Sequence, residues 1–290
     1  MADLALARAE NIPGNFYVDS TCIDCDTCRW VAPASFDRKG GQSIVFDQPG
    51  NRHLEIQALQ ALLACPTSSI GMKFKSEYLT EARNSFPIAI ADNVYYCGYH
   101  SEDSFGAASY FIKLPGGNIL IDSPRFNMPL AKKLDALGGI AYMYLTHIDD
   151  VADHAKFRSH FNCQRIIHTD DQRKNLGEIE IVIQGSEEKH LSDDITIIPV
   201  PGHTKGHSVL LYANKFLFTG DHLAFSKRLN QLHAFRNACW YSWKEQIKSM
   251  EKLLNYSFEW VLPGHGRRFQ TDSQSMLVEL QKCISWMKTK

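Results

Sequence analysis

The stretch that decides the fold reads Thr146-His147-Ile148-Asp149-Asp150-Val151-Ala152-Asp153-His154. It follows the apolar residues 140–145, so the pattern predicts a buried strand that ends in a loop of polar side chains. Two histidines and three aspartates offer imidazole nitrogen and carboxylate oxygen together, a mixture that suits zinc, manganese or non-haem iron. The loop alone also fits a polar helix start, with Asp150 or Asp153 as the capping residue. The rest of the chain decides between these interpretations.

Four other predicted strands also end in histidine or aspartate. Asp122 follows residues 119–121, Pro201-Gly202-His203-Thr204-Lys205-Gly206-His207 follows residues 195–200, Gly220-Asp221 follows residues 216–219, and Pro263-Gly264-His265-Gly266 follows residues 260–262. Loops at strand ends are where a rigid scaffold presents its chemistry. One such histidine would be interpreted as a structural hydrogen-bonding residue, but five strand ends of this kind predict a metal centre.

In this order the motifs resemble the metallo-β-lactamase superfamily, over roughly residues 80–290. The resemblance implies an α+β fold built as a four-layer αββα sandwich, which holds one or two metal ions. The ligands that it implies are His147, His203 and Asp221 for the first ion, and Asp153, His154 and His265 for the second. Asp221 would bridge the two ions, and metal-bound hydroxide would be the nucleophile.

The opening loop departs from the family pattern His-x-His-x-Asp-His. Two extra residues separate His147 from the Asp153-His154 pair, and Asp149 stands where the second histidine is expected, with Asp150 as its close competitor. A carboxylate in place of an imidazole favours iron or manganese over a zinc-only site. It also leaves a set of two histidines and one carboxylate, the ligand type of non-haem iron oxygenases. Asp149 and Asp153 are the candidates for orienting a nucleophile, and His207 is a candidate catalytic residue that faces the substrate or supports the ligands.

The N-terminal quarter carries a separate cysteine motif. Cys22-Ile-Asp-Cys25-Asp-Thr-Cys28 is followed at a distance by Cys65-Pro66. Thiolates at this spacing can wrap an iron–sulfur cube whose fourth ligand comes from a distant segment. The segment resembles bacterial-type ferredoxins, and the resemblance implies one [4Fe–4S] cluster held by these four cysteines.

A second cluster is not expected. The two-cluster pattern places a further Cys-Pro four residues after the third cysteine, where this chain has Ala32-Pro33. A zinc site with four thiolates is the alternative. We therefore predict two domains, a small α+β ferredoxin-like domain over residues 1–75 and the metallo-β-lactamase-fold domain over residues 76–290.

Composition limits the partners and the location. The 290 residues carry a formal net charge of -1, which argues against a broad nucleic-acid surface. The chain shows neither a leader peptide nor an apolar run long enough to span a bilayer. We expect a cytoplasmic location, or a plastid stroma in a plant-type source, and no membrane partner.

Three functions are consistent with these motifs. The first is a metallo-hydrolase in which metal-bound hydroxide attacks a thioester, lactone or phosphoester. The second is a redox enzyme whose cluster exchanges electrons with a non-haem iron site that acts on oxygen or a sulfur species, together with a redox partner protein. The third is a binding protein that senses iron or redox state. Residues 222–243 are interpreted either as a clamp for an anionic small-molecule substrate or as a surface that receives the ferredoxin-like domain.

Overall fold

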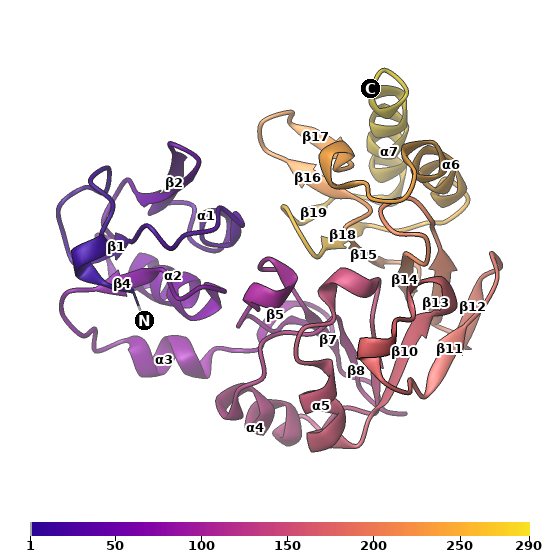
Figure 1. Cartoon of the computed structure of the whole chain (residues 1–290), viewed down its shortest axis with the longest axis horizontal. Coiled ribbons are helices and arrows are strands. Elements are labelled where there is room, and N and C mark those ends of the chain that lie inside the picture. Colours follow the sequence, from indigo (N-terminus) through magenta and orange to yellow (C-terminus); the bar gives the residue numbers. More distant parts are fainter. Residues whose placement is uncertain (1) are drawn as a thin grey trace. The chain divides into compact units, whose positions relative to one another are not determined.

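The computed structural model describes residues 2–290 and divides the chain into two compact units (Figure 1). Unit 1 comprises the residues up to Asn118 together with Ser123–Ile140, and unit 2 comprises Ile119–Asp122 together with Ala141–Lys290. Unit 1 therefore extends well beyond residue 75, and the predicted domain boundary at 75/76 stays a prediction.

The first part of unit 1 is built from short elements around a small apolar core. Its elements are β1 (Phe16–Val18), α1 (Thr27–Val31), β2 (Phe36–Lys39), β3 (Gln42–Val45), α2 (Arg52–Ala64) and β4 (Ile70–Met72). β1 pairs antiparallel with β4, and β2 forms a hairpin with β3. α2 begins after Asn51, whose side chain accepts a hydrogen bond from the Leu54 amide at 3.0 Å.

The rest of unit 1 contains a helix, three antiparallel strands and a further helix. These are α3 (Leu79–Asn84), β5 (Ile88–Ala91), β6 (Val94–Tyr96), β7 (Tyr110–Ile112) and α4 (Met128–Ala136). The connection between β6 and β7 includes a short 3₁₀ turn, η2 (Glu102–Ser104), and residues 97–101 and 106–109 on either side of it are buried. Such burial of a connection requires internal partners for its polar groups.

Unit 2 starts from four parallel strands and one helix. They are β8 (Ile119–Ile121), β9 (Tyr142–Tyr144), β10 (Gln164–His168), β11 (Ile181–Ile183) and α5 (His154–Phe161). The apolar residues of β8 and β10 are almost fully buried, as expected for parallel strands covered on both faces. The predicted helix over residues 151–161 begins only at His154, because residues 148–150 form the 3₁₀ turn η3 (Ile148–Asp150).

A six-stranded sheet faces these parallel strands. Its strands, in spatial order, are β12 (Lys189–Ser192), β13 (Ile195–Pro199), β14 (Ser208–Tyr212), β15 (Phe216–Gly220), β18 (Trp260–Pro263) and β19 (Phe269–Gln270). The Tyr144 hydroxyl donates to Ser208 Oγ at 2.7 Å, which links the two sheets. A hairpin of β16 (Ala224–Ser226) and β17 (Gln231–His233) follows β15.

Two helices cover the outer face of the six-stranded sheet, as Figure 1 shows. α6 (Trp243–Leu253) and α7 (Ser273–Met287) contribute Met250, Leu253, Met276 and Leu280 to a core shared with β13, β14, β15 and β18. Unit 2 therefore has layers of helix, sheet, sheet and helix. Among residues 2–290, no helix combines the length and apolar character needed to cross a bilayer.

Candidate functional site

His147 lies directly after β9, and its ring is held in place from behind. The Thr146 hydroxyl lies 3.0 Å from each carboxylate oxygen of Asp122 and 2.9 Å from His147 Nδ1. Because a carboxylate only accepts, the hydroxyl donates to Asp122 and accepts from His147 Nδ1–H. Nε2 is then the unprotonated ring nitrogen, and its lone pair lies on the side of the ring opposite Thr146. Proteins commonly orient a metal-binding histidine in this way, by a hydrogen bond from its other ring nitrogen.

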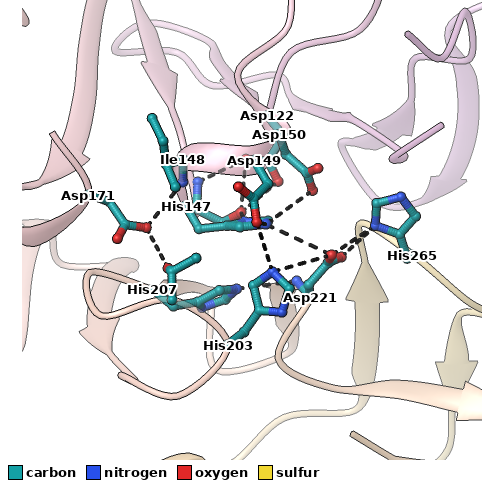
Figure 2. Close-up of polar contacts among 12 residues, drawn as sticks. Asp122, His147, Ile148, Asp149, Asp150, Asp171, His203, His207, Asp221 and His265 are labelled. Carbon is teal, nitrogen blue, oxygen red and sulfur yellow. Dashed lines mark hydrogen bonds and ion pairs between the residues drawn. The ribbon is translucent and has the colours of Figure 1, made fainter. Parts of the chain in front are cut away.

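Three loops, which carry residues 147–150, His203 and Asp221, bring polar side chains close to one another at His147 Nε2, as Figure 2 shows. Nε2 lies 3.9 Å from Asp149 Oδ2, 4.0 Å from Asp150 Oδ2 and 3.8 Å from Asp221 Oδ2. His203 Nε2 lies 3.3 Å from the same Asp149 oxygen and 3.7 Å from the same Asp221 oxygen. Two overlapping groups, His147–Asp149–His203 and His147–Asp150–Asp221, therefore have the geometry to hold a metal ion.

The buried donors of this cluster fit a metal ion. His147 Nε2 and both carboxylate oxygens of Asp150, a residue only 1% exposed, are buried and make no hydrogen bond with any of residues 2–290. Orphaned polar atoms of this kind are costly without a partner. Gly264 keeps space beside them, because a Cβ there would lie 2.6 Å from Asp150 Oδ2 and 3.1 Å from Asp221 Oδ1. Imidazole nitrogen and carboxylate oxygen suit zinc, iron or manganese.

The protonation states of the cluster follow from burial and charge. Burial lowers the pKa of His147 to about 4, against the opposing effect of the Asp221 charge, so the ring is neutral at pH 7. Burial, and then the nearby Asp221 charge, raise the pKa of Asp150 well above its usual value. The hydrogen bond from His203 lowers the pKa of Asp149, whose side chain is 46% exposed. Without a metal ion, Asp150 therefore holds a proton more tightly than a carboxylate in water does, and Asp149 holds one less tightly.

Metal binding is therefore expected to displace a proton from Asp150. Protons compete with the ion for this carboxylate, so affinity for Zn²⁺ rises with pH, by about tenfold per pH unit for each proton released. His147 adds nothing to this slope above pH 5, because it is already neutral. Competition titrations of Zn²⁺ between pH 5.5 and 7.5 should give a slope steeper by about one proton in the unchanged protein than in Asp150→Asn. Equal slopes would contradict this assignment.

Asp171 was not identified from the sequence, yet it ties two ligand-bearing loops together. It is fully buried, and its carboxylate accepts from the Ile148 amide at 3.1 Å, the Thr204 hydroxyl at 2.5 Å and the Gly206 amide at 2.8 Å. These donors flank His147 in one loop and His203 in the other (Figure 2). Its partners lie more than 20 residues away, so no local sequence pattern marks it.

His207, predicted as a catalytic residue, is buried against His147 and Asp221. Its Nε2 accepts from the Asp221 amide at 3.2 Å, and its ring stacks on His147 with centroids 4.8 Å apart. His207 is fully buried, so it supports the neighbouring ligands in this structure, and its predicted role facing the substrate stays a prediction.

The structure does not bring Asp153 and His154 into the cluster. His154 Nδ1 lies 3.0 Å from Nη1 of buried Arg165, which also pairs with Glu180. Asp153 Oδ1 lies 2.7 Å from Lys156 Nζ. Both residues sit at the start of α5, beyond the η3 turn, and Asp150 occupies the place near His147 that they were predicted to fill.

His265 lies at the edge of the cluster, next to Asp221. Its Nδ1 is 2.7 Å from Asp221 Oδ1 and 2.9 Å from Oδ2. This contact and the neighbouring histidines lower the pKa of Asp221, although burial alone would raise it. His265 therefore orients Asp221, and its predicted role as a ligand stays a prediction.

The four N-terminal cysteines line one cavity in unit 1. Cys22, Cys25, Cys28 and Cys65 are all free thiols that surround this cavity together with Thr27, Ser43 and Ser69. Backbone amides of Ser43 and Ser69 point at Cys22 Sγ (3.4 Å) and Cys65 Sγ (3.3 Å). Burial raises the pKa of Cys25 to about 11 and that of Cys28 further, so a bound cationic centre is needed to keep them as thiolates. The site fits an iron–sulfur cluster.

Gly106 closes this cavity from a segment outside the cysteine motif. Its φ is +86°, and a Cβ there would lie 2.9 Å from Cys25 Cβ and 3.0 Å from Cys25 Sγ. We expect Gly106→Ala to destabilise the unit by roughly 1–2 kcal/mol through the left-handed backbone alone. Iron and acid-labile sulfide per chain should fall as well, because Cys25 must move. Gly116→Ala, which meets no atom within 4 Å, is the matched control, and equal cluster loading in the two variants would refute the prediction.

Comparison with known proteins agrees with both parts of this description. Residues 18–72 match the family model described as the 4Fe-4S single cluster domain of Ferredoxin I. A hydroxyacylglutathione hydrolase from Mesorhizobium japonicum is 31% identical over 126 residues, which is 42% of this chain and 48% of the relative. The aligned region thus spans about half the length of that curated relative.

Solved structures establish the fold. The metallo-β-lactamase from Hirschia baltica superposes with a TM-score of 0.54 at 16% identity, covering 69% of this chain and 95% of its own. The metallo-β-lactamase from Pontibacter korlensis gives a TM-score of 0.52 at 16% identity, covering 70% of this chain and 98% of its own. The predicted fold class is confirmed: this chain has the metallo-β-lactamase fold, preceded by a segment similar to single-cluster ferredoxins.

Proposed function

We propose that this protein is a metal-dependent hydrolase of the metallo-β-lactamase type, fused to a domain that holds one [4Fe–4S] cluster through Cys22, Cys25, Cys28 and Cys65. The observation that carries the proposal is the convergence of His147, His203, Asp221 and Asp150. Among residues 2–290, His147 Nε2 and both carboxylate oxygens of Asp150 have no hydrogen-bond partner. A divalent ion held there would supply Lewis-acid polarisation of a carbonyl or phosphoryl oxygen and would acidify water. The substrate class is a thioester, lactone or phosphoester.

The side chains of the site have distinct tasks in this proposal. Asp122 and Thr146 fix the orientation of His147, and Asp171 holds the loops that carry His147 and His203. Asp149 is ionised and solvent-facing, so it can accept a hydrogen bond from water and take up a proton as water is consumed. Buried His207 and partly exposed His265 keep Asp221 in position.

The exposed aromatic residues Trp240 and Tyr241, which we call the aromatic wall, lie beside His203 and support the proposal of a small-molecule substrate. Trp240 is 66% exposed, and its ring centroid lies 6.2 Å from that of His203. The backbone amides of Trp240 and Tyr241 donate to the His203 carbonyl at 2.8 and 3.0 Å, so the wall is fixed to the ligand loop. An exposed large aromatic side chain held this firmly is a contact surface for an apolar part of a ligand.

A redox enzyme is the second candidate function. His147, His203 and Asp221 form a set of two histidines and one carboxylate, and Asp149 and Asp150 add further oxygen donors. This chemistry favours iron, and a cluster domain is otherwise unexplained in a hydrolase. In this proposal the cluster exchanges electrons with an iron site that acts on oxygen or a sulfur species, through an external redox partner protein.

Metal analysis and turnover of anaerobically purified protein distinguish the two. The hydrolase proposal predicts turnover of thioester, lactone or phosphodiester substrates that is lost in His203→Ala and unchanged when the cluster is destroyed by air oxidation. The redox proposal predicts iron in the histidine site and oxygen uptake that requires an intact cluster. No hydrolysis of any of the three classes by metal-loaded protein would rule out the first function, and a site that takes up only zinc would rule out the second.

A further inference from the structure

A fully buried histidine, His100, lies beside the cysteine cavity but outside the segment that matches ferredoxins. His100 follows β6, in the connection that leads to Gly106, and its side chain is 0% exposed. Its ring packs between Tyr96 and Trp30, with centroid distances of 5.6 and 5.9 Å. All of these residues belong to unit 1.

The hydrogen bonds of His100 fix where its proton lies. Nδ1 is 2.5 Å from the Gly106 carbonyl oxygen and 3.0 Å from Thr27 Oγ1, and Nε2 is 2.7 Å from the Tyr96 hydroxyl. A carbonyl can only accept, so Nδ1 carries the proton and donates on that side. Nε2 then accepts from the Tyr96 hydroxyl.

This arrangement sets the direction of the Thr27 hydroxyl. The single Nδ1–H of His100 is shared between the Gly106 carbonyl and, at the longer distance, Thr27 Oγ1. The Thr27 hydroxyl thus keeps its own proton for Cys25 Sγ at 3.3 Å or the Gly106 carbonyl at 3.4 Å. The Gly106 carbonyl already accepts from His100 at the shorter distance. A cysteine that binds a cluster is a thiolate and can only accept, so Thr27 is placed to donate to Cys25 Sγ.

We propose that His100 is a positioning residue that raises the reduction potential of the cluster by holding the Thr27 hydroxyl on Cys25 Sγ. The inference rests on the proposed cluster. Hydrogen bonds to cluster sulfurs stabilise the reduced, more negative state and so raise the potential. The donors to Cys22 and Cys65 come from the ferredoxin-like segment itself, whereas this one depends on a residue supplied by the connection between β6 and β7. The potential of the cluster is thus set partly by the second part of unit 1.

Redox titration of the full-length protein, followed by electron paramagnetic resonance of the reduced cluster, tests the proposal. Thr27→Val keeps the shape of the side chain and removes the hydroxyl, and His100→Phe removes the N–H donor. Each should shift the ratio of reduced to oxidised cluster at a fixed potential by about tenfold toward the oxidised form, which is 59 mV for one electron. Thr27→Ser and His100→Asn keep a hydrogen-bond donor, so the reduction potential of these variants should stay close to that of the unchanged protein. His53→Phe, at an exposed histidine of α2, is the control.

The measured potentials of these variants decide whether His100 and Thr27 set the potential of the cluster. Unchanged potentials in both Thr27→Val and His100→Phe would overturn the proposal, as would a shift in His100→Phe that Thr27→Val does not reproduce. If His100→Phe does not assemble a cluster, the comparison of Thr27→Val with Thr27→Ser decides, and equal potentials in that pair would reject the role of the hydroxyl. Absence of iron and acid-labile sulfide from the unchanged protein would instead refute the proposed cluster, so the two failures are distinguishable.

Discussion

Replacing His147 with alanine is expected to empty the metal centre. His147 belongs to both groups of convergent donors, and in the described part of the chain its Nε2 makes no hydrogen bond. Loss of supporting residues around metal ligands alone lowers affinity by about 10–100-fold, so loss of a shared ligand should cost at least about 100-fold. Zn²⁺ or Fe²⁺ bound per chain after dialysis, and hydrolytic turnover, should fall together.

His154→Ala is the matched control for this experiment. His154 is also a buried histidine of the same loop region, but its Nδ1 contacts Arg165 instead of the cluster. Its replacement should leave metal content unchanged. The same contrast applies to carboxylates, where Asp150→Asn should lower metal affinity and Asp153→Asn should not. Metal loss in His154→Ala and Asp153→Asn as well as in His147→Ala would restore the ligand set implied by the family resemblance, and retention of metal in His147→Ala would refute the assignment of His147 as a ligand.

Replacing Asp171 with alanine is expected to destabilise unit 2 and loosen the metal centre at the same time. Its removal leaves two backbone amides and one hydroxyl without an acceptor, and each buried donor left unpaired costs about 1–3 kcal/mol. A total loss of roughly 3 kcal/mol lowers the melting temperature of a domain of this size by roughly 6–12 °C. Metal affinity should fall about 10–100-fold, because the loops of His147 and His203 are no longer joined.

Asp170, the residue before Asp171, provides the control. Asp170 pairs with Lys205 at the surface, with a distance of 2.9 Å and side chains 35% and 56% exposed. Exposed pairs of this kind contribute about 0–1 kcal/mol, so Asp170→Ala should leave both the melting temperature and the metal affinity nearly unchanged. Asp171→Asn should be intermediate, because the amide keeps one accepting oxygen but presents a donor in place of the other. If Asp171→Ala and Asp170→Ala behave alike, Asp171 does not hold the site together.

The sequence alone was sufficient for the fold class, and it predicted several of the polar residues that the fold brings together. Cysteines at positions 22, 25, 28 and 65 surround one cavity, as their spacing predicted. His147, His203 and Asp221 meet because each directly follows a strand or the turn after it, and strands of packed sheets end at common edges. Glycine and proline beside these residues, as at Gly264, mark places where backbone approaches a ligand closely.

Only the tertiary structure decided which acidic residue joins the cluster and what holds it there. The η3 turn brings Asp150 close to His147, and α5 begins only at His154, where Asp153 and His154 contact Lys156 and Arg165. Sequence spacing cannot reveal the direction of a side chain in an irregular loop. Asp171 and His100 act through donors and acceptors that are distant in sequence. The sequence determines which groups can bind or donate, because this is a property of each residue type. The long-range hydrogen bonds that orient these groups form only when separate loops meet in the folded chain.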